Sequence, residues 1–290
     1  MDLRAIVMGL AFAAMWSSAF TSARVIVAYA PPLASLSLRF LISGLIGVLI
    51  ARALGQSWRL TPEQWRATIL FGLCQNALYL GLNFVAMQTV EASMAAIIAS
   101  TMPLLVAIAG VLIFREGITA LGLVGLLAGV CGVVLIMGAR LESGTDPLGV
   151  ILCLVGVLSL TVATLSVRVA SSGGNVLMIV GLQMLVGSAI LAVPAALFES
   201  LEVTLTWQLV VAFIYTTLVP GPLATLVWFL LVGRIGAVKA ATFHFLNPVF
   251  GVAIAALLLG ERLGWLDALG VLIIAGGILA VQLSRRPTKG

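Results

Sequence analysis

Two stretches of the chain share one spacing of proline, acid and glycine. Residues 103–116 read PLLVAIAGVLIFRE and residues 248–261 read PVFGVAIAALLLGE, so both prolines and both glutamates coincide at an offset of 145 residues. The glycines that follow, Gly125 and Gly270, keep the same offset. Because 145 is half of the 290 residues, the chain is predicted to be a duplicated unit.

Apolar residues dominate the chain on both sides of these stretches. Hydrophobic residues make up 62% of the sequence, and only 25 residues, or 9%, are charged, against roughly 25% in soluble domains. So few charges cannot cover a water-facing surface, which excludes a soluble enzyme. A spanning helix needs about 20 apolar residues. Ten runs of that kind cover residues 5–28, 33–52, 66–86, 92–113, 119–138, 148–168, 175–198, 207–231, 237–258 and 264–283.

These runs predict an all-α integral membrane protein with ten transmembrane helices. The alternating pattern of a lipid-facing β-barrel is absent, which leaves helices as the way to cross the bilayer. Each half of the chain, 1–145 and 146–290, holds five runs. Because five is odd, the second half enters the membrane from the opposite side, which predicts two inverted repeats. Secondary transporters are typically built from such repeats around a central site.

The distribution of Lys and Arg predicts the orientation, because cytoplasmic loops carry an excess of both. With the N-terminus inside, cytoplasmic segments hold eleven basic residues and external segments hold three, namely Arg24, Arg140 and Arg262. Both termini are therefore expected in the cytoplasm of a bacterial-type cell, with the protein in its inner (plasma) membrane. The net charge of +5 then reports topology, and no nucleic-acid partner is expected. The first run is too long for a typical signal peptide and is predicted to be a retained helix.

Several sequence features occur together in one family of transporters. They are Trp16, Pro31-Pro32 followed by Arg39-Phe40, and the two blocks Pro103, Glu116, Gly125 and Pro248, Glu261, Gly270. With them the chain resembles the drug/metabolite transporter superfamily, in particular its ten-helix EamA-type exporters, and it is similar to the YddG-type amino-acid exporters. The resemblance implies efflux of small metabolites, including aromatic and other neutral amino acids. It also implies a central cavity among helices 1–4 and 6–9, with helices 5 and 10 peripheral.

Polar side chains in the third run form one stripe. Asn76, Tyr79 and Asn83 are spaced i, i+3 and i+7 and share a helix face. Polar groups inside a membrane usually face a bundle interior or a water-filled cavity, so the three residues are predicted to line the substrate cavity. The alternative is hydrogen bonding between helices. Ser100 in the fourth run is a further cavity candidate, although small hydroxyl residues often bond their own helix backbone.

Prolines interrupt three of the apolar runs. Pro103 and Pro248 occupy matching positions of the two halves, and Pro220, Gly221 and Pro222 lie together in the eighth run. Proline removes a helix hydrogen bond and kinks the helix, so all five residues are candidate hinges for alternating access. Fixed bends that shape the cavity are the alternative. Carbonyl groups freed near Pro220 are expected to face substrate, beside Trp228.

The ninth run carries the single histidine of the chain, His244, with Asn247 three residues on. The matching residues of the first half are Ala99 and Met102, so this pair breaks the repeat, as a substrate-specific feature would. We predict that His244 and Asn247 contact substrate. The alternative is a hydrogen-bonded packing histidine. In the first run Trp16 and Ser17 are predicted to join them on the path.

Arg39 is the one charged residue clearly inside a run. A central arginine costs about 2.5–3.5 kcal/mol on insertion scales. The favoured interpretation is structural, with Arg39 paired to Glu91 or to backbone carbonyls. The alternative is a contact with a substrate carboxylate. Glu116 and Glu261 are expected to lie at the starts of helices 5 and 10, where negative charge is favourable.

Together these residues predict a carrier that exports small neutral or zwitterionic metabolites, such as amino acids, by alternating access. All ten carboxylates fall at or near the ends of runs, so facilitated diffusion is at least as favoured as coupling through His244. No cofactor and no metal is expected, and the partners are a small-molecule substrate and the lipid bilayer. The alternatives are a membrane-embedded lipid-modifying enzyme, an open pore, or an exporter of drugs or sugars.

Overall fold

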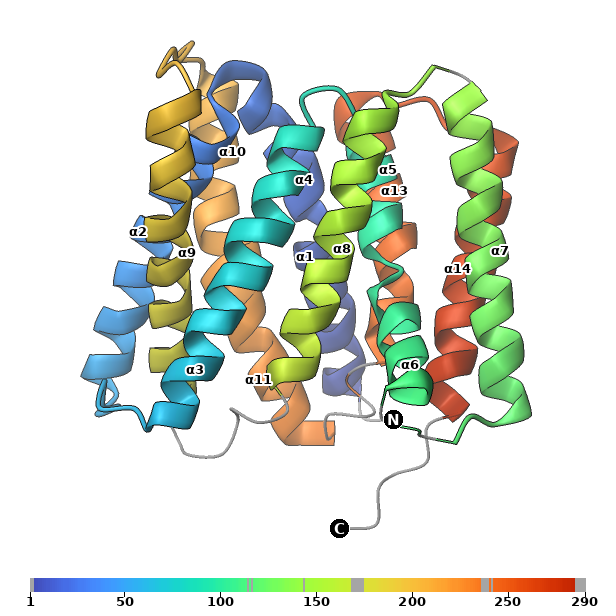
Figure 1. The fold of residues 1–290 in the computed structure, drawn as a ribbon, viewed down its shortest axis with the longest axis horizontal. Coiled ribbons are helices and arrows are strands. Elements are labelled where there is room, and N and C mark those ends of the chain that lie inside the picture. Colours follow the sequence, from blue (N-terminus) through green and yellow to red (C-terminus); the bar gives the residue numbers. More distant parts are fainter. Residues whose placement is uncertain are drawn as a thin grey trace. The chain divides into compact units, whose positions relative to one another are not determined.

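The computed structural model describes residues 3–113, 115, 117–142, 144–167, 175–235, 240 and 242–284. Every regular element in these ranges is helical (Figure 1). Eight helical segments are long and apolar enough to cross a membrane, and two shorter apolar ones, Trp207–Leu223 and Phe243–Leu259, fall where the eighth and ninth runs were predicted. The protein is therefore a multi-pass membrane protein of about ten helices.

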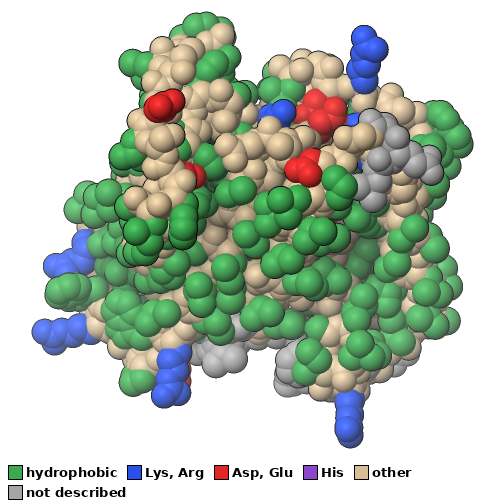
Figure 2. Space-filling model, turned by 45° about the horizontal axis from the view of Figure 1, so that its top comes forward, with side chains coloured by type: hydrophobic (Ala, Val, Ile, Leu, Met, Phe, Trp, Pro, Cys, Tyr) green, Lys and Arg blue, Asp and Glu red, His purple; other side chains and the backbone are tan. Residues whose placement is uncertain are grey.

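The long spans match the predicted runs within a few residues. They are α1 (Leu3–Tyr29), α2 (Pro32–Ala53), the segment Pro62–Ala86 formed by α3 (Pro62–Phe71), η1 (Gly72–Leu80) and α4 (Gly81–Ala86), the segment Ala92–Leu112 formed by α5 (Ala92–Ala99) and α6 (Met102–Leu112), α7 (Ala120–Glu142), α8 (Pro147–Val167), α9 (Val176–Phe198) and α14 (Trp265–Ser284). On the face drawn in Figure 2 hydrophobic side chains predominate, and charged side chains lie toward its upper and lower ends. Such a surface suits lipid contact.

Two of the helix breaks lie directly before predicted prolines. The fourth span is interrupted at Ser100 and Thr101, and Pro103 is the second residue of α6. Pro248 likewise is the second residue of α13 (Asn247–Leu259), which follows the 3₁₀ segment η3 (Thr242–Leu246). Proline fits the first turn of a helix because its missing N–H has no partner there in any case.

The other two breaks are π-helical. Pro220, Gly221 and Pro222 lie in η2 (Val219–Leu223), between α10 (Trp207–Leu218) and α11 (Ala224–Ile235). The wider π register is a way to pass residues that lack a donor N–H. The segment η1 in the third span is also π-helical, although it contains no proline, and the sequence did not predict it. Short π segments occur frequently at functional sites.

The chain forms two compact units, each drawn from both halves of the sequence. The first unit comprises Met1–Thr21, Thr89–Val150 and Leu223–Gly290, and the second comprises Ser22–Gln88 and Ile151–Pro222.

In the first unit α7 packs along α14 through glycines (Figure 1). A Cβ atom at Gly125 would lie 2.7 Å from the carbonyl oxygen of Gly277, and one at Gly132 would lie 3.0 Å from that of Gly270. Only residues without side chains allow this backbone approach, which is the typical way for membrane helices to associate.

In the second unit α2 packs along α9 in a similar manner. A Cβ atom at Gly47 would meet the Cα of Gly181 at 3.1 Å. Ser37 and Ser188 exchange hydrogen bonds across the same contact, each hydroxyl donating to the other residue's carbonyl oxygen at 2.9 and 2.8 Å. Both helices therefore approach closely and satisfy their polar groups at the interface.

Glu261 occupies a different place from the one expected. It lies before α14 begins, and its carboxylate accepts hydrogen bonds from the backbone N–H groups of Ala92 and Ser93 at 2.8 and 3.0 Å. It therefore caps the start of α5, and the expectation that it begins helix 10 was wrong. Its counterpart in the first half, Glu116, lies outside the described residues.

Candidate substrate-binding site

An aromatic cluster lies within the first unit. It consists of Phe12 and Trp16 from α1, Trp228 from α11 and His244 from η3. The ring centroid of Phe12 lies 5.8 Å from that of Trp16, 4.7 Å from that of Trp228 and 5.4 Å from that of His244, with the imidazole edge-on to the phenyl ring. Trp228 and His244 are 5.2 Å apart. The structure thus brings together three residues that the sequence singled out separately.

The sequence reasoning missed Phe12, which contacts each of the other three rings. A signal for it was present, because Phe12 and Trp16 are four residues apart and therefore lie on the same helix face. Phe12 is almost fully buried, whereas Trp16, Trp228 and His244 remain partly exposed. Phe12 is therefore the most buried ring of the cluster, and Trp228 also packs against the apolar core formed by Ala5, Leu231, Ala240 and Phe243.

The His244–Asn247 pair is joined by a hydrogen bond. Nδ2 of Asn247 lies 3.0 Å from Nδ1 of His244, so the amide donates and the imidazole nitrogen accepts. His244 then carries its proton on Nε2. The amide oxygen Oδ1 of Asn247 is buried and has no hydrogen-bond partner among the described residues. Because a buried polar atom without a partner is costly, this oxygen is a candidate acceptor for a ligand donor.

Local backbone geometry explains the position of His244. Pro248 has no N–H group, so the carbonyl of His244, four residues earlier, cannot accept the usual helix hydrogen bond. The backbone forms the 3₁₀ segment η3 instead of continuing α13. Ser17 also contacts this segment, because its hydroxyl donates a hydrogen bond to the carbonyl oxygen of Asn247 at 3.2 Å. The side chain of Ser17 is almost fully buried, so it connects α1 to the start of α13.

Ser100 lies at the break between α5 and α6. Its side chain is buried, and its hydroxyl donates to the carbonyl oxygen of Ala96 at 2.6 Å. This is the bond to its own helix that the sequence left open as an alternative.

The third-span stripe lies in the second unit and is fully buried. Asn76, Tyr79 and Asn83 expose 2%, 2% and 1% of their surfaces. Asn76 donates to the carbonyl oxygen of Gln183 on α9 at 2.9 Å, and Asn83 donates to that of Tyr79 at 2.8 Å. Glycines of neighbouring helices cover two of these side chains, since a Cβ at Gly187 would lie 2.4 Å from Cβ of Asn76 and one at Gly156 would lie 2.8 Å from Nδ2 of Asn83.

The carbonyl groups beside Pro220 have partners in the second unit. Pro220 offers no N–H to the carbonyl of Thr216, and Nε of Arg39 donates to that oxygen at 3.1 Å. The hydroxyl of Ser43 donates to the carbonyl oxygen of Thr217 at 2.9 Å. The expectation that freed carbonyls face substrate was therefore wrong for these two. Arg39 makes the carbonyl contact that was one of its two structural alternatives.

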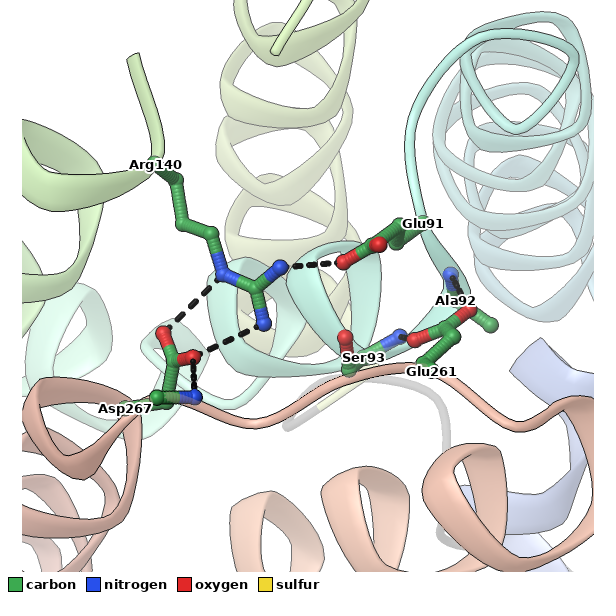
Figure 3. Close-up of polar contacts among 7 residues, drawn as sticks. Glu91, Ala92, Ser93, Arg140, Glu261 and Asp267 are labelled. Atoms are coloured by element: carbon green, nitrogen blue, oxygen red, sulfur yellow. Dashed lines mark hydrogen bonds and ion pairs between the residues drawn. The ribbon is translucent and has the colours of Figure 1, made fainter. Parts of the chain in front are cut away.

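Charged side chains form a separate network in the first unit (Figure 3). Arg140 at the end of α7 contacts Glu91, which precedes α5, through Nη1. Its Nε and Nη2 lie 3.0 Å from the two carboxylate oxygens of Asp267 at the start of α14. Glu91 is thus paired with Arg140, so the expected pairing of Arg39 with Glu91 was wrong. Glu261 caps α5 beside this network (Figure 3).

The described residues contain no group of three or more His, Cys, Asp or Glu that could hold a metal ion. The aromatic cluster itself offers ring faces for stacking, and an imidazole and an amide for hydrogen bonding.

Comparison with known proteins places the chain in a family. The model of the EamA-like transporter family matches residues 3–138 and, a second time, residues 147–283. The chain belongs to the EamA-like transporter family. Its two matched stretches together cover nearly all of the sequence.

Similar proteins carry transporter names. The chain is 27% identical over 276 residues to the uncharacterized transporter YvbV of Bacillus subtilis, covering 95% of this chain and 90% of YvbV. It is 28% identical over 275 residues to the uncharacterized inner membrane transporter YedA of Escherichia coli K12, covering 93% and 88%. A chloroplastic WAT1-related protein of Arabidopsis thaliana is 24% identical over 277 residues, covering 92% and 66%.

A solved crystal structure without a functional description has the same fold as this EamA-like transporter. It superposes with a TM-score of 0.70 at 21% sequence identity, covering 98% of this chain and 99% of the other.

Proposed function

We propose that this EamA-like transporter exports small neutral or zwitterionic metabolites, amino acids with aromatic side chains among them, by alternating access. The family and its named relatives supply the class, that of a membrane transporter. The substrate, the direction and the mechanism are our proposal. We place the protein in the inner membrane with both termini in the cytoplasm, on the strength of its eleven cytoplasmic against three external basic residues.

The aromatic cluster is the observation that carries this proposal. Three partly exposed rings, those of Trp16, Trp228 and His244, gather around Phe12. An aromatic contact adds about 0.5–1.5 kcal/mol beyond the burial of apolar area, so a substrate with a planar side chain gains from each ring that it meets. The unpartnered Oδ1 of Asn247 supplies an acceptor for an ammonium or hydroxyl group.

We assign the third-span stripe a supporting role in this proposal. Asn76, Tyr79 and Asn83 are buried against helices of their own unit, which favours the alternative of helix packing over that of cavity lining. The candidate substrate contacts then reduce to Trp16, Trp228, His244 and Asn247, with Ser17 and Ser100 holding backbone carbonyls. Pro103, Pro248 and the Pro220-Gly221-Pro222 segment remain our candidate hinges, because each lies where the helix is broken.

Counterflow in proteoliposomes tests the proposed function. Vesicles loaded with unlabelled phenylalanine are expected to accumulate labelled phenylalanine. Among other amino acids, those with planar aromatic side chains are expected to inhibit this uptake most strongly. A pH gradient is expected to leave the final accumulation unchanged, because we favour facilitated diffusion. If amphiphilic drugs or sugars exchange and no amino acid does, the proposed substrate class is wrong. If a proton gradient drives uphill accumulation, facilitated diffusion is wrong.

Substitutions in the cluster localise the site in the same assay. Trp228→Ala and His244→Ala are expected to lower counterflow of phenylalanine about five- to thirtyfold, since each removes roughly 1–2 kcal/mol of stacking or hydrogen bonding. Leu257→Ala is the matched control, because Leu257 lies on α13 near the cluster in sequence but is 82% exposed. Normal transport by His244→Ala at every pH would exclude a substrate contact at His244.

A further inference from the structure

Arg39 lies within the membrane span α2 and is almost completely buried. It exposes 5% of its surface, and it belongs to a span with a mean hydropathy of 2.1. An ionisable residue at such a position is costly and is usually retained for a function. Its surroundings in the second unit therefore indicate what that function is.

The guanidinium group of Arg39 is only partly satisfied. Arginine has five N–H donors, and among the described residues the one hydrogen bond recorded for it runs from Nε to the carbonyl oxygen of Thr216. The ring of Phe40 lies 5.1 Å from the guanidinium carbon. The carboxylates of Glu91 and Asp267 pair with Arg140 instead. Arg39 is thus a buried cation without a carboxylate partner in the described part of the chain.

A methyl group at Gly221 would fit beside the atom that Arg39 binds, at ordinary contact distances. A Cβ added at Gly221 would meet Ser43 Oγ at 3.8 Å and the Thr216 carbonyl oxygen at 4.0 Å, with no other atom as close. By contrast, a Cβ atom added at Gly44, five residues after Arg39 on α2, would lie 2.7 Å from the side chain of Leu185. The buried Gly221 therefore borders looser packing than the helix contact does, at the carbonyl to which Arg39 is anchored.

We propose that Arg39 binds a carboxylate group of the transported solute through its terminal amino groups. The planar guanidinium fork matches a carboxylate in a bidentate geometry. One positive charge balances a monocarboxylate, whereas a phosphate dianion would leave a second charge buried and unpaired. The Nε bond to Thr216 fixes the orientation of the fork. This inference rests on the proposed carrier function, and it adds that recognised substrates carry a carboxylate.

The test compares ligands that differ in the carboxylate alone. The purified full-length protein in detergent is titrated with L-phenylalanine, phenylacetate, phenylalaninamide and phenethylamine while its thermal unfolding is followed. Phenylalanine and phenylacetate are expected to raise the unfolding midpoint. The two ligands without a carboxylate are expected to need at least about tenfold higher concentrations for the same rise. The proposal is overturned if phenylalanine and its amide raise the wild-type midpoint equally. It is also overturned if neither phenylalanine nor phenylacetate raises it.

Variants separate binding from support of the broken helix. Arg39→Gln removes the charge, and Pro220→Ala restores the N–H group that the Thr216 carbonyl lacks. In Arg39→Gln/Pro220→Ala the unfolding midpoint without ligand is expected to lie close to that of Pro220→Ala alone, while the response to phenylacetate is at least about tenfold weaker than in Pro220→Ala. Arg39→Lys is expected to be intermediate. If the double variant binds phenylacetate like Pro220→Ala, Arg39 merely holds the carbonyl and the proposal fails.

The same variants distinguish this proposal from that of the carrier. If phenylacetate binds in an Arg39-dependent manner while no amino acid shows counterflow, the carboxylate site stands and the amino-acid function fails. If amino acids exchange normally in Arg39→Gln/Pro220→Ala vesicles, the function stands and the carboxylate site fails.

Discussion

Arg39 is buried and Arg140 is mostly shielded from solvent, and the partners of the two arginines differ. The side chain of Arg140 is 11% exposed and lies between the carboxylates of Glu91 and Asp267 (Figure 3). Arg39 exposes 5% and contacts a carbonyl oxygen and an aromatic ring. Each arginine belongs to a different compact unit.

The difference indicates what each charge is for. A buried ion pair approximately offsets its own desolvation cost, while removing one partner leaves the other charge uncompensated. Arg140 has two partners, from the start of α14 and the residue before α5, so it fastens these helix ends to α7. Arg39 donates to the Thr216 carbonyl oxygen, but it has no carboxylate among the described residues to offset its charge. A ligand carboxylate supplies the missing partner.

The largest effect is expected when the paired arginine is removed. Arg140→Met leaves the carboxylates of Asp267 and Glu91 without their cation, and we expect a loss of about 3 kcal/mol in the free energy of unfolding. The value lies at the low end for buried pairs because Glu91 is 43% exposed. Arg262→Met is the control, since Arg262 is exposed. A loss of less than about 1 kcal/mol would show that Arg140 is not a fastening residue.

A smaller effect is expected for a carboxylate that binds backbone instead of arginine. Glu261→Ala removes two acceptors from the N–H groups of Ala92 and Ser93, and helix caps contribute about 1–2 kcal/mol. Glu199 is the matched case in the second unit, because it accepts from Leu33 and Ala34 at 2.8 Å each. Chemical unfolding of Glu261→Ala and Glu199→Ala is expected to give similar losses. A loss confined to one variant would contradict the shared capping role.

The unpaired arginine is expected to contribute little to stability. Arg39→Gln loses one charge-assisted hydrogen bond, worth about 1.5–3 kcal/mol, and the relief of burying a charge offsets most of that loss. We therefore expect its unfolding free energy to change by less than about 1 kcal/mol, well below the change in Arg140→Met. The comparison between the two arginines breaks down if both substitutions destabilise the protein equally.

The smallest effect concerns an exposed acid at the edge of a span. The hydroxyl of Thr89, which donates to Asp146 at 2.7 Å, lowers the pKa of Asp146, with the N–H groups of Leu148 and Gly149 adding to the shift. The stability gained from a lowered carboxyl pKa is present above the ordinary value and is lost as pH falls through the folded-state value. Thr89→Val is expected to reduce stability at neutral pH, and its difference from wild type is expected to shrink as pH falls through the lowered folded-state pKa of Asp146.

Unfolding midpoints measured from neutral pH down through and below the ordinary aspartate pKa check this prediction. Thr145→Val is the neighbouring control, and it is expected to give a pH-independent difference. A constant offset for Thr89→Val over the same range would contradict the assigned role of the hydroxyl.

The sequence predicted the spans and most of the breaks, because both depend on local composition. Apolar runs of about 20 residues have few alternatives to a spanning helix, and proline cannot donate a hydrogen bond wherever it lies. The π-helical segment η1 escaped prediction since no proline or charge marks it. The partners of buried polar groups escaped it too. Thr216 is 177 residues from Arg39, and Glu261 is 169 residues from Ala92, so no local pattern reports either contact.

Composition and spacing by themselves determined that the protein lies in a membrane, where its helices run, and that its charges stay at their ends with the exception of Arg39. These properties follow from the cost of placing polar groups in lipid, which acts on each segment separately. Only the tertiary structure decided which side chains meet. It gathered Phe12, Trp16, Trp228 and His244 into one cluster, and it gave two carboxylates to Arg140 and none of the described ones to Arg39. Such pairings depend on how helices distant in sequence pack, and that packing is a property of the whole fold.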